Sequence, residues 1–513
     1  MIEDGKIFVG GGGENYADAQ SLLTKYANRH GLIAGATGTG KTVTLQVLAE
    51  SFSELGVPIF LTDVKGDLSG LAKAGSPTFK LHDAFTERAQ KIKFDSYKYA
   101  EYPVVFWDLH GVQGHPIRTT VADLGPLLLS RMLELSEAQE GIINIAFRVS
   151  DEEGWPLLDL KDLRAMLTWV AENARDLTMR YGYVQIGSVA TIQRRLLVLE
   201  NEGGAQLFGE PALDLSDMFV KSDVGKGRIN ILAADKLMQA PRLYATFLLW
   251  LLSELFETLP ELGNPEKPEL VLFFDEAHLL FEGSPKALMD KIEQVARLIR
   301  SKGVAVFFIT QKPADVPVDI LGQLGNRIQH ALRAFTGRDI RMLNAAAESY
   351  RANPDFDTRE AIKNVGVGEA VTSFLERKGI PSVVQRTLIR PPSSQLGPIS
   401  TQERAAVIAA SPIAGKYEAV LDRDSAYEIL LRRAEKAALD AAAAEAGEEG
   451  MSIAEREVST SRRYTGSKVS RSTSKRRTDS IGQTFAKSLA RTLGNRAGNA
   501  IVRGVLGSIF KGL

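Results

Sequence analysis

A glycine-rich segment in the first tenth of the chain has the residue types and spacing of a phosphate-binding loop. It consists of Gly35, Ala36, Thr37, Gly38, Thr39, Gly40, Lys41 and Thr42. Glycines allow the backbone to curl around phosphate oxygens, and the N-terminus of a following helix adds partial positive charge. At this spacing Lys41 would reach the β- and γ-phosphates of a nucleotide, and Thr42 would bind Mg²⁺. We therefore predict that residues 35–43, ending at Val43, bind ATP with Mg²⁺; the alternative is a glycine turn with an exposed lysine.

Two adjacent carboxylates follow an apolar run at residues 270–274. Asp275 can hold Mg²⁺ through its water shell, because this ion prefers oxygen ligands and retains bound water. Glu276 is placed to orient and deprotonate the water that attacks the γ-phosphate. On this hypothesis Asp275 is a metal ligand and Glu276 is the catalytic base. The alternative is a strand that ends in an acidic turn.

A polar side chain also ends the apolar run at residues 304–310. If this run is the strand beside the loop strand, the Gln311 amide can hydrogen-bond the γ-phosphate or the attacking water. It would then report whether the γ-phosphate is present, and the alternative is a turn-capping residue before Pro313. Lys41, Glu276 and Gln311 are thus our predicted catalytic residues.

Short runs rich in β-branched and aromatic residues must supply the strands that carry these groups. They are residues 31–34, 58–63, 103–109, 228–233, 270–275, 304–310, 327–335 and 382–390. Helical patterns lie between many of them, which favours an α/β fold with a mainly parallel sheet. Continuous apolar runs indicate a sheet covered on both faces. We predict that residues 1–115 and 227–395 are the two parts of this core.

The remaining segments differ in character from the core. Residues 116–226 have the pattern of amphipathic helices and are predicted to form a helical insertion, and residues 396–458 to form a helical extension. Residues 459–480 are rich in Ser, Thr, Lys and Arg, which predicts a disordered basic linker. Residues 481–513 have the pattern of a basic amphipathic helix that could contact a membrane surface, a protein or nucleic acid.

The composition excludes several classes of site and suggests one kind of partner. The chain has no cysteine, which excludes disulfides, thiolate metal sites and cysteine catalysis and suits the cytoplasmic localisation that we predict. No apolar run reaches the length of about 18 residues that a membrane span requires. The formal net charge is −1, yet residues 456–513 carry 13 Lys and Arg against two acidic residues. A basic tail on an acidic body suggests a polyanion or an acidic surface as partner, and a solubilising tail is the alternative.

Six motifs together resemble those of the HerA/FtsK superfamily of P-loop ATPases. They are residues 35–42, 63–67 (D-V-K-G-D), 273–278 (F-F-D-E-A-H), 297–303 (R-L-I-R-S-K-G), 307–313 (F-F-I-T-Q-K-P) and 324–328 (L-G-N-R-I). More closely, residues 5–395 resemble bacterial HerA-like proteins with a HerA C-terminal-type domain. The resemblance implies a RecA-like P-loop NTPase core of the type with an additional strand and a catalytic glutamate. It identifies residues 35–42 as Walker A, Asp275 and Glu276 as Walker B, and Gln311 as the sensor.

The resemblance also implies ATP hydrolysis in a homo-oligomeric ring, commonly a hexamer, that moves DNA. Ring ATPases use an arginine from the neighbouring subunit to stabilise charge on the γ-phosphate. By resemblance, Arg300 or Arg327 is the predicted arginine finger or same-chain sensor, and a surface cation is the alternative. Two other functions stay open: a ring ATPase acting on protein or membrane-associated cargo, and an ATP-dependent scaffold with little turnover. The adjacent carboxylates argue against the scaffold.

Overall fold

The computed structural model describes residues 2–281 and 286–460 of the chain. The predicted basic amphipathic helix, residues 481–513, lies outside the described residues, as does all but the start of the predicted disordered linker, residues 459–480. Among the described helices, none combines the length and the apolar composition that a membrane span requires. The chain divides into two compact units, which we call unit 1 and unit 2.

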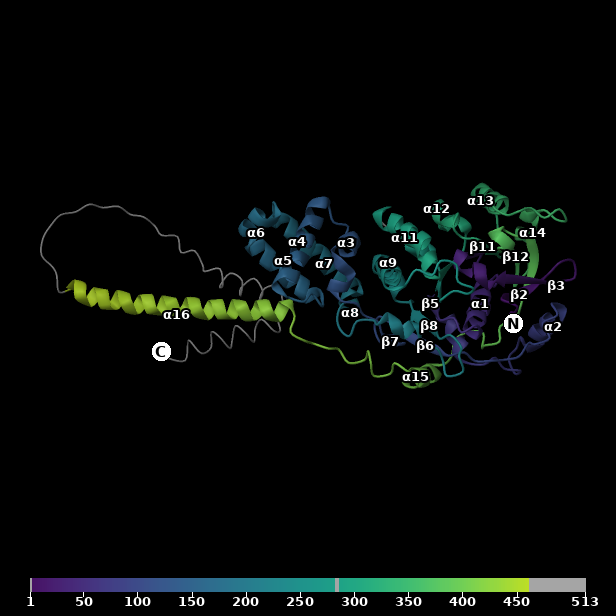
Figure 1. The fold of residues 1–513 in the computed structure, drawn as a ribbon, viewed down its shortest axis with the longest axis horizontal. Coiled ribbons are helices and arrows are strands. Elements are labelled where there is room, and N and C mark those ends of the chain that lie inside the picture. The colour runs from purple at the N-terminus through teal and green to yellow at the C-terminus, as the bar shows by residue number, and fades with distance from the viewer. Residues whose placement is uncertain (1, 282–285, 461–513) are drawn as a thin grey trace. The chain divides into compact units, whose positions relative to one another are not determined.

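Unit 1 comprises residues 1–119, 131–134 and 198–421 and is built on one sheet, which has thirteen strands within the described residues (Figure 1). In chain order the strands are β1 (Ile2–Glu3), β2 (Lys6–Gly12), β3 (Asp18–Leu23), β4 (Gly31–Ala34), β5 (Ile59–Asp63), β6 (Val104–Asp108), β7 (His115–Pro116), β8 (Ile229–Ala233), β9 (Leu270–Phe274), β10 (Val304–Thr310), β11 (Asn326–Gln329), β12 (Glu369–Ser373) and β13 (Gln385–Ile389). They lie side by side in the order β1-β2-β13-β12-β11-β4-β10-β9-β5-β8-β6-β7, and β3 pairs with β2.

The stretch of the sheet from β11 to β7 is parallel, and the strands from β1 to β12 pair antiparallel. Strand β10 lies between β4, which leads into the glycine-rich loop, and β9, which ends just before Asp275. One additional strand therefore separates the loop strand from the carboxylate strand, as in the RecA-like cores that the sequence resembles. The predicted α/β fold with a mainly parallel sheet is confirmed.

Helices cover both faces of the parallel strands. The helices of unit 1 are α1 (Lys41–Glu54), α2 (His82–Lys91), α8 (Ala205–Leu207), α9 (Pro241–Thr258), α10 (His278–Phe281), α11 (Lys286–Leu298), α12 (Val318–Leu321), α13 (Gly337–Glu348), α14 (Thr358–Asn364) and α15 (Thr401–Ala409). On one face, Phe52 of α1 packs against Phe273 and Phe307. On the other, Phe281 of α10 contacts Phe308. Burial on both sides explains why these strands are continuously apolar.

A buried ion pair fastens the chain after β13 to α1. The side chains of Glu50 and Arg390 are fully buried, and Arg390 Nη1 lies 3.0 Å from Glu50 Oε2. The amides of Ser393 and Ser394 donate to Glu50 Oε1, and Arg390 Nη2 donates to the Val47 carbonyl over 2.9 Å. Residues 390–394 are therefore held against the helix that follows the glycine-rich loop.

Unit 2 is helical in the residues that the structure describes. It contains α4 (Glu137–Glu153), α5 (Leu160–Glu172), α6 (Ala174–Tyr181), most of α3 (Val121–Met132) and α7 (Ile186–Leu199), and α16 (Ala426–Thr460). Helix α16 lies alongside α5 (Figure 1), where the Tyr427 amide donates to Asp162 over 2.9 Å. Unit 2 thus combines helices from the predicted insertion with a helix from the predicted extension.

Candidate functional site

The glycine-rich loop joins β4 to α1 through backbone conformations that favour glycine. Gly35, Gly38 and Gly40 have φ angles of 153°, 78° and 113°. A Cβ atom at Gly35 would lie 2.5 Å from the Cβ atom of His330, so this position has no room for a side chain. The glycine spacing therefore permits the tight curl between Ala34 and Lys41.

Amide groups of this loop are free to bind an anion. Within the described residues, the amides of Thr37, Gly38 and Gly40 donate to no protein acceptor. The first amides of α1 also lack intrahelical partners, as at the start of any helix. Such a curled set of N–H donors, together with the partial positive charge of the helix, suits phosphate oxygens. The loop therefore fits the phosphates of a nucleotide.

The Lys41 side chain folds back over the loop. Its Nζ atom donates to the Gly35 carbonyl over 2.7 Å and to the Ala36 carbonyl over 3.2 Å. Burial lowers the pKa of Lys41, the nearby charge of Glu276 acts in the opposite direction, and Lys65 lowers it further. The two carbonyl oxygens are the hydrogen-bond partners of this buried ammonium group. A phosphate bound in the loop would give it an anionic partner instead. Thr42, the next residue, is partly exposed.

His330 is a buried histidine that packs against the loop and that the sequence analysis did not identify as a site residue. His330 Nδ1 lies 2.8 Å from the Glu369 carbonyl oxygen, and Nε2 lies 2.8 Å from the Thr44 hydroxyl. Because a carbonyl only accepts, Nδ1 carries the proton and Nε2 accepts from Thr44. Burial, opposed by the Glu369 carbonyl, lowers the pKa of His330 to about 4, so the ring is neutral at pH 7. A lone histidine after a strand gives no sequence signal for this role.

Asp275 lies at the carboxyl end of β9, in the buried edge of the sheet. The Asp275 amide donates to the Thr62 hydroxyl over 3.0 Å, and the Glu276 amide donates to Asp275 Oδ1 over 2.9 Å. Burial, with the charge of Glu276 next, raises the pKa of Asp275 to about 7. A buried carboxylate beside a second carboxylate is stabilised in its ionised form by a cation. Asp275 therefore has the surroundings expected of a metal ligand.

Glu276 forms the centre of a polar cluster between β5, β9 and β10. Its Oε1 atom accepts from Lys65 Nζ over 2.7 Å, and its Oε2 atom accepts from Gln311 Nε2 over 3.4 Å. Burial alone would raise the pKa of Glu276, but the hydrogen bond and charge of Lys65 outweigh it and lower the pKa. The structure thus brings Gln311 to Glu276. Lys65, from the D-V-K-G-D motif, contacts Glu276.

The structure does not bring the two predicted arginines to this cluster. Arg300 lies just before β10, at the opposite end of the strand from Gln311, and donates to Asn264 over 3.3 Å. Arg327 pairs in register with Leu32, in the first half of β4. Neither position allows the same-chain sensor role that we considered. A contribution to the site of a neighbouring subunit stays a prediction.

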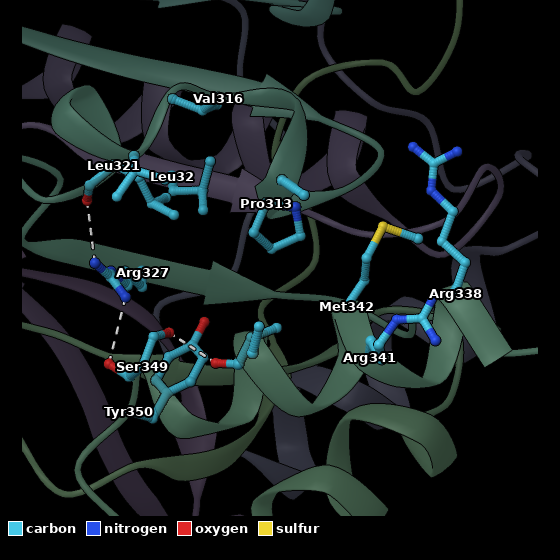
Figure 2. Close-up of a pocket in the computed structure, with 14 residues that line it drawn as sticks. Leu32, Pro313, Val316, Leu321, Arg327, Arg338, Arg341, Met342, Ser349 and Tyr350 are labelled. Atoms are coloured by element: carbon cyan, nitrogen blue, oxygen red, sulfur yellow. Dashed lines mark hydrogen bonds between the residues drawn. The ribbon is translucent and has the colours of Figure 1, made fainter.

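The Arg327 guanidinium is engaged by backbone carbonyls. It donates to Leu321 over 3.1 Å, to Leu324 over 3.0 Å and to Ser349 over 3.3 Å. Figure 2 shows two of these bonds at the wall of a cavity of about 360 Å³, which Arg338 also lines. These contacts give Arg327 a structural role in joining β11 to the residues around it.

A comparison with protein families decides the relationship of this chain. The family described as helicase HerA-like C-terminal matches residues 12–512. The chain belongs to this family. No curated protein sequence matches it significantly.

Several solved structures are similar to this HerA-like chain at low sequence identity. The bacterial conjugative coupling protein TrwB is 13% identical over 77% of this chain and 92% of that chain, with a TM-score of 0.49. VirB4 of Thermoanaerobacter pseudethanolicus is 13% identical over 76% and 97%, with a TM-score of 0.47. The cytoplasmic domain of the type VII secretion ATPase EccC of Thermomonospora curvata is 15% identical over 82% of this chain and 31% of that chain, with a TM-score of 0.29.

The HerA-like site has the ligands for a metal that is shared with a nucleotide. Within residues 2–281 and 286–460, no group of three or more His, Asp or Glu side chains could hold a metal by itself. Mg²⁺ in nucleotide sites needs only one or two protein ligands, because phosphate and water oxygens complete its shell. The Thr42 hydroxyl and the Asp275 carboxylate would supply those ligands. The residues present therefore fit Mg²⁺ bound together with ATP.

Proposed function

We propose that this HerA-like chain is a Mg²⁺-dependent ATP hydrolase. The observation that carries the proposal is the position of Glu276: a buried carboxylate bonded to Gln311, next to Asp275, at the same sheet edge as the curled loop with Lys41. Phosphate binding alone needs only the loop. Activation of the attacking water requires, in addition, a second carboxylate beside the metal ligand.

In the proposed reaction, the loop amides and Lys41 hold the β- and γ-phosphates, and Thr42 and Asp275 hold the metal. Mg²⁺, when bound, neutralises charge on the phosphate oxygens. Glu276 accepts a proton from the water that attacks the γ-phosphorus, while the Gln311 amide holds that water in line. The bond from the γ-phosphorus to the bridging oxygen breaks, which gives ADP and phosphate.

We also propose that the chain acts as a homo-oligomeric ring, commonly hexameric, that moves DNA. The helicase description of the family supports this proposal. Arg300 is the better of the two arginine-finger candidates, because one long hydrogen bond to Asn264 leaves its guanidinium available. Arg327, with three carbonyl partners, is less available.

The test is the ATPase rate of the full chain with and without duplex DNA, together with the mass of the assembly. We expect Mg²⁺-dependent turnover that duplex DNA stimulates most at low salt, because phosphate contacts weaken as salt rises. Turnover without any response to DNA would favour protein or membrane-associated cargo. Tight ATP binding without turnover would favour the scaffold, and a monomer in the presence of ATP would contradict the ring.

A Lys41→Ala variant is expected to bind ATP about ten- to a hundredfold more weakly, because it loses a charged hydrogen bond to phosphate. A fluorescent ATP analogue measures the affinity. Lys25→Ala is the matched control, since Lys25 forms an ion pair with the exposed Glu266, and its affinity should equal that of the wild type. Equal affinities of the Lys41 and Lys25 variants would refute the role of the loop.

A further inference from the structure

Lys65 holds the carboxylate to which we assign the role of catalytic base. Its Nζ atom lies 2.7 Å from Glu276 Oε1, and it comes from the turn after β5, the strand beside β9. The Glu276 side chain is only 5% exposed, so its carboxylate has little freedom to turn elsewhere. The other carboxylate oxygen, Oε2, lies 3.4 Å from Gln311 Nε2 and 3.4 Å from His278 Nδ1.

A carboxylate held in this way is a poor base. A proton acceptor must point a lone pair at the water that it deprotonates. In Glu276, the lone pairs of Oε1 face the Lys65 ammonium group and therefore do not point at a water molecule. The contact therefore has to loosen before Glu276 can take a proton.

The turn that carries Lys65 is fixed, whereas the lysine side chain is free to move. The Asp63 carboxylate accepts from the amides of Gly66 over 2.8 Å and Leu68 over 3.0 Å. Gly66 has a φ angle of 77°, which favours glycine. The Lys65 side chain itself is 42% exposed at the end of a flexible four-carbon stem. It can leave Glu276 without any change of the backbone.

Lys65 also lies where phosphate charge would arrive. Its partner Glu276 directly follows Asp275, the proposed metal ligand, and both carboxylates lie at the same sheet edge as the loop that would bind the phosphates. An anion bound there competes directly with Glu276 for the ammonium group.

We propose that Lys65 is a positioning residue that restrains Glu276 until a phosphate oxyanion draws its ammonium group away. The inference rests on the proposed ATP hydrolysis and adds its regulation. Two sources can supply the oxyanion: the γ-phosphate of bound ATP, or a backbone phosphate of nucleic acid that reaches the exposed side of Lys65. The chemistry is the same for both, and the experiment separates them.

The test compares wild type, Lys65→Met, Lys65→Arg and Lys25→Met as full chains. Methionine keeps the length of lysine without its charge, arginine keeps the charge, and Lys25 provides a half-exposed lysine paired with a glutamate away from the site. The rate constant kcat and the KM for ATP are measured with and without duplex DNA. Circular dichroism confirms that each variant is folded.

We expect Lys65→Met to raise kcat without DNA about tenfold, with little change in KM, because one charged hydrogen bond to the base is lost. Lys25→Met should keep the wild-type rate, and Lys65→Arg, which retains the positive charge, should turn over more slowly than Lys65→Met. If DNA no longer stimulates Lys65→Met, the nucleic-acid phosphate is the releasing anion. If DNA stimulates it by the wild-type factor, DNA acts elsewhere, and the γ-phosphate of ATP releases Lys65 in only about one bound complex in ten.

A folded Lys65→Met variant whose kcat is equal to or below that of the wild type would overturn the inference. So would an equal rise in the Lys25→Met control. If Glu276→Gln abolishes turnover and Lys65→Met turns over at the wild-type rate, the restraint by Lys65 is refuted and the proposed hydrolysis stands. Absence of turnover in the wild type and in every variant would refute both the restraint and the proposed hydrolysis. Turnover in Lys65→Met alone would support both.

Discussion

A Glu276→Gln variant should lose ATP turnover by about a hundredfold to ten-thousandfold, the contribution typical of a general base. Glutamine has the shape of glutamate, and its one carbonyl oxygen can still accept from Lys65 while its NH2 group donates to the Gln311 carbonyl oxygen once that amide is flipped, so the site should remain assembled. It cannot take a proton from water. We therefore expect kcat to fall while ATP affinity stays near that of the wild type, as measured by steady-state turnover and by binding of a fluorescent ATP analogue.

The matched control for this variant is Glu266→Gln. Glu266 is an exposed acid whose side chain pairs with Lys25, and it precedes the start of β9, whereas Asp275 and Glu276 follow the end of that strand. Its turnover should equal that of the wild type. Wild-type turnover in Glu276→Gln would show that another group activates the water. A loss of ATP binding equal to the loss of turnover would show that Glu276 holds the nucleotide site together instead.

A Glu50→Ala variant should lose about 3–5 kcal/mol of unfolding free energy, which is the usual cost of removing one partner from a buried ion pair. Arg390 would stay fully buried without its carboxylate, and the amides of Ser393 and Ser394 would lose their acceptor. Urea unfolding measures the change. Because Glu50 lies on α1, nucleotide affinity should fall as well.

Glu266→Ala provides the comparison for stability. It removes one partner of an exposed ion pair, and such pairs contribute at most about 1 kcal/mol. A Glu50→Ala protein as stable as Glu266→Ala would mean that the segment after β13 does not depend on its contact with α1.

The parallel strands could be predicted because burial on both faces makes them continuously apolar. The predicted strand at residues 304–310 coincides with β10, and the predicted run at 270–275 exceeds β9 by one residue. The run at 327–335 was wrong in its last six residues, since β11 ends at Gln329. Beyond Gln329 the chain turns under the loop, where His330 bonds to Thr44.

On the antiparallel side of the sheet, the predicted run at 382–390 contains β13, but β1, β2, β3 and β12 escaped prediction because they lack that signal. Strand β2 ends in three glycines, which are rare in strands. Their reason is steric: a Cβ atom at Gly10 would lie 2.1 Å from the Leu388 carbonyl oxygen, and one at Gly11 would lie 1.9 Å from the Tyr16 carbonyl oxygen. The close approach of the Gly10 backbone to that of Leu388, which is distant in the sequence, leaves no pattern in the neighbouring residues that would predict a strand.

The site was predictable where its residues are consecutive and unpredictable where they meet through folding. Loop residues 35–42 and the pair Asp275 and Glu276 form continuous motifs. Lys65 lies 211 positions from Glu276, and its partner could be identified only when β5 and β9 were known to be neighbours. The positions of Arg300 and Arg327 likewise depend on which end of a strand each occupies.

The pairing of Glu50 with Arg390 also bears on the synthesis of the protein. The two residues are 340 positions apart. At a ribosomal rate of about 5–20 residues per second, Arg390 is synthesised roughly 20 to 70 s after Glu50. Until then, a nascent chain that already carries the complete glycine-rich loop has an unpaired carboxylate on the helix behind it. Nucleotide binding should therefore arise late, when the chain after β13 has left the ribosome, and not when the loop itself is made.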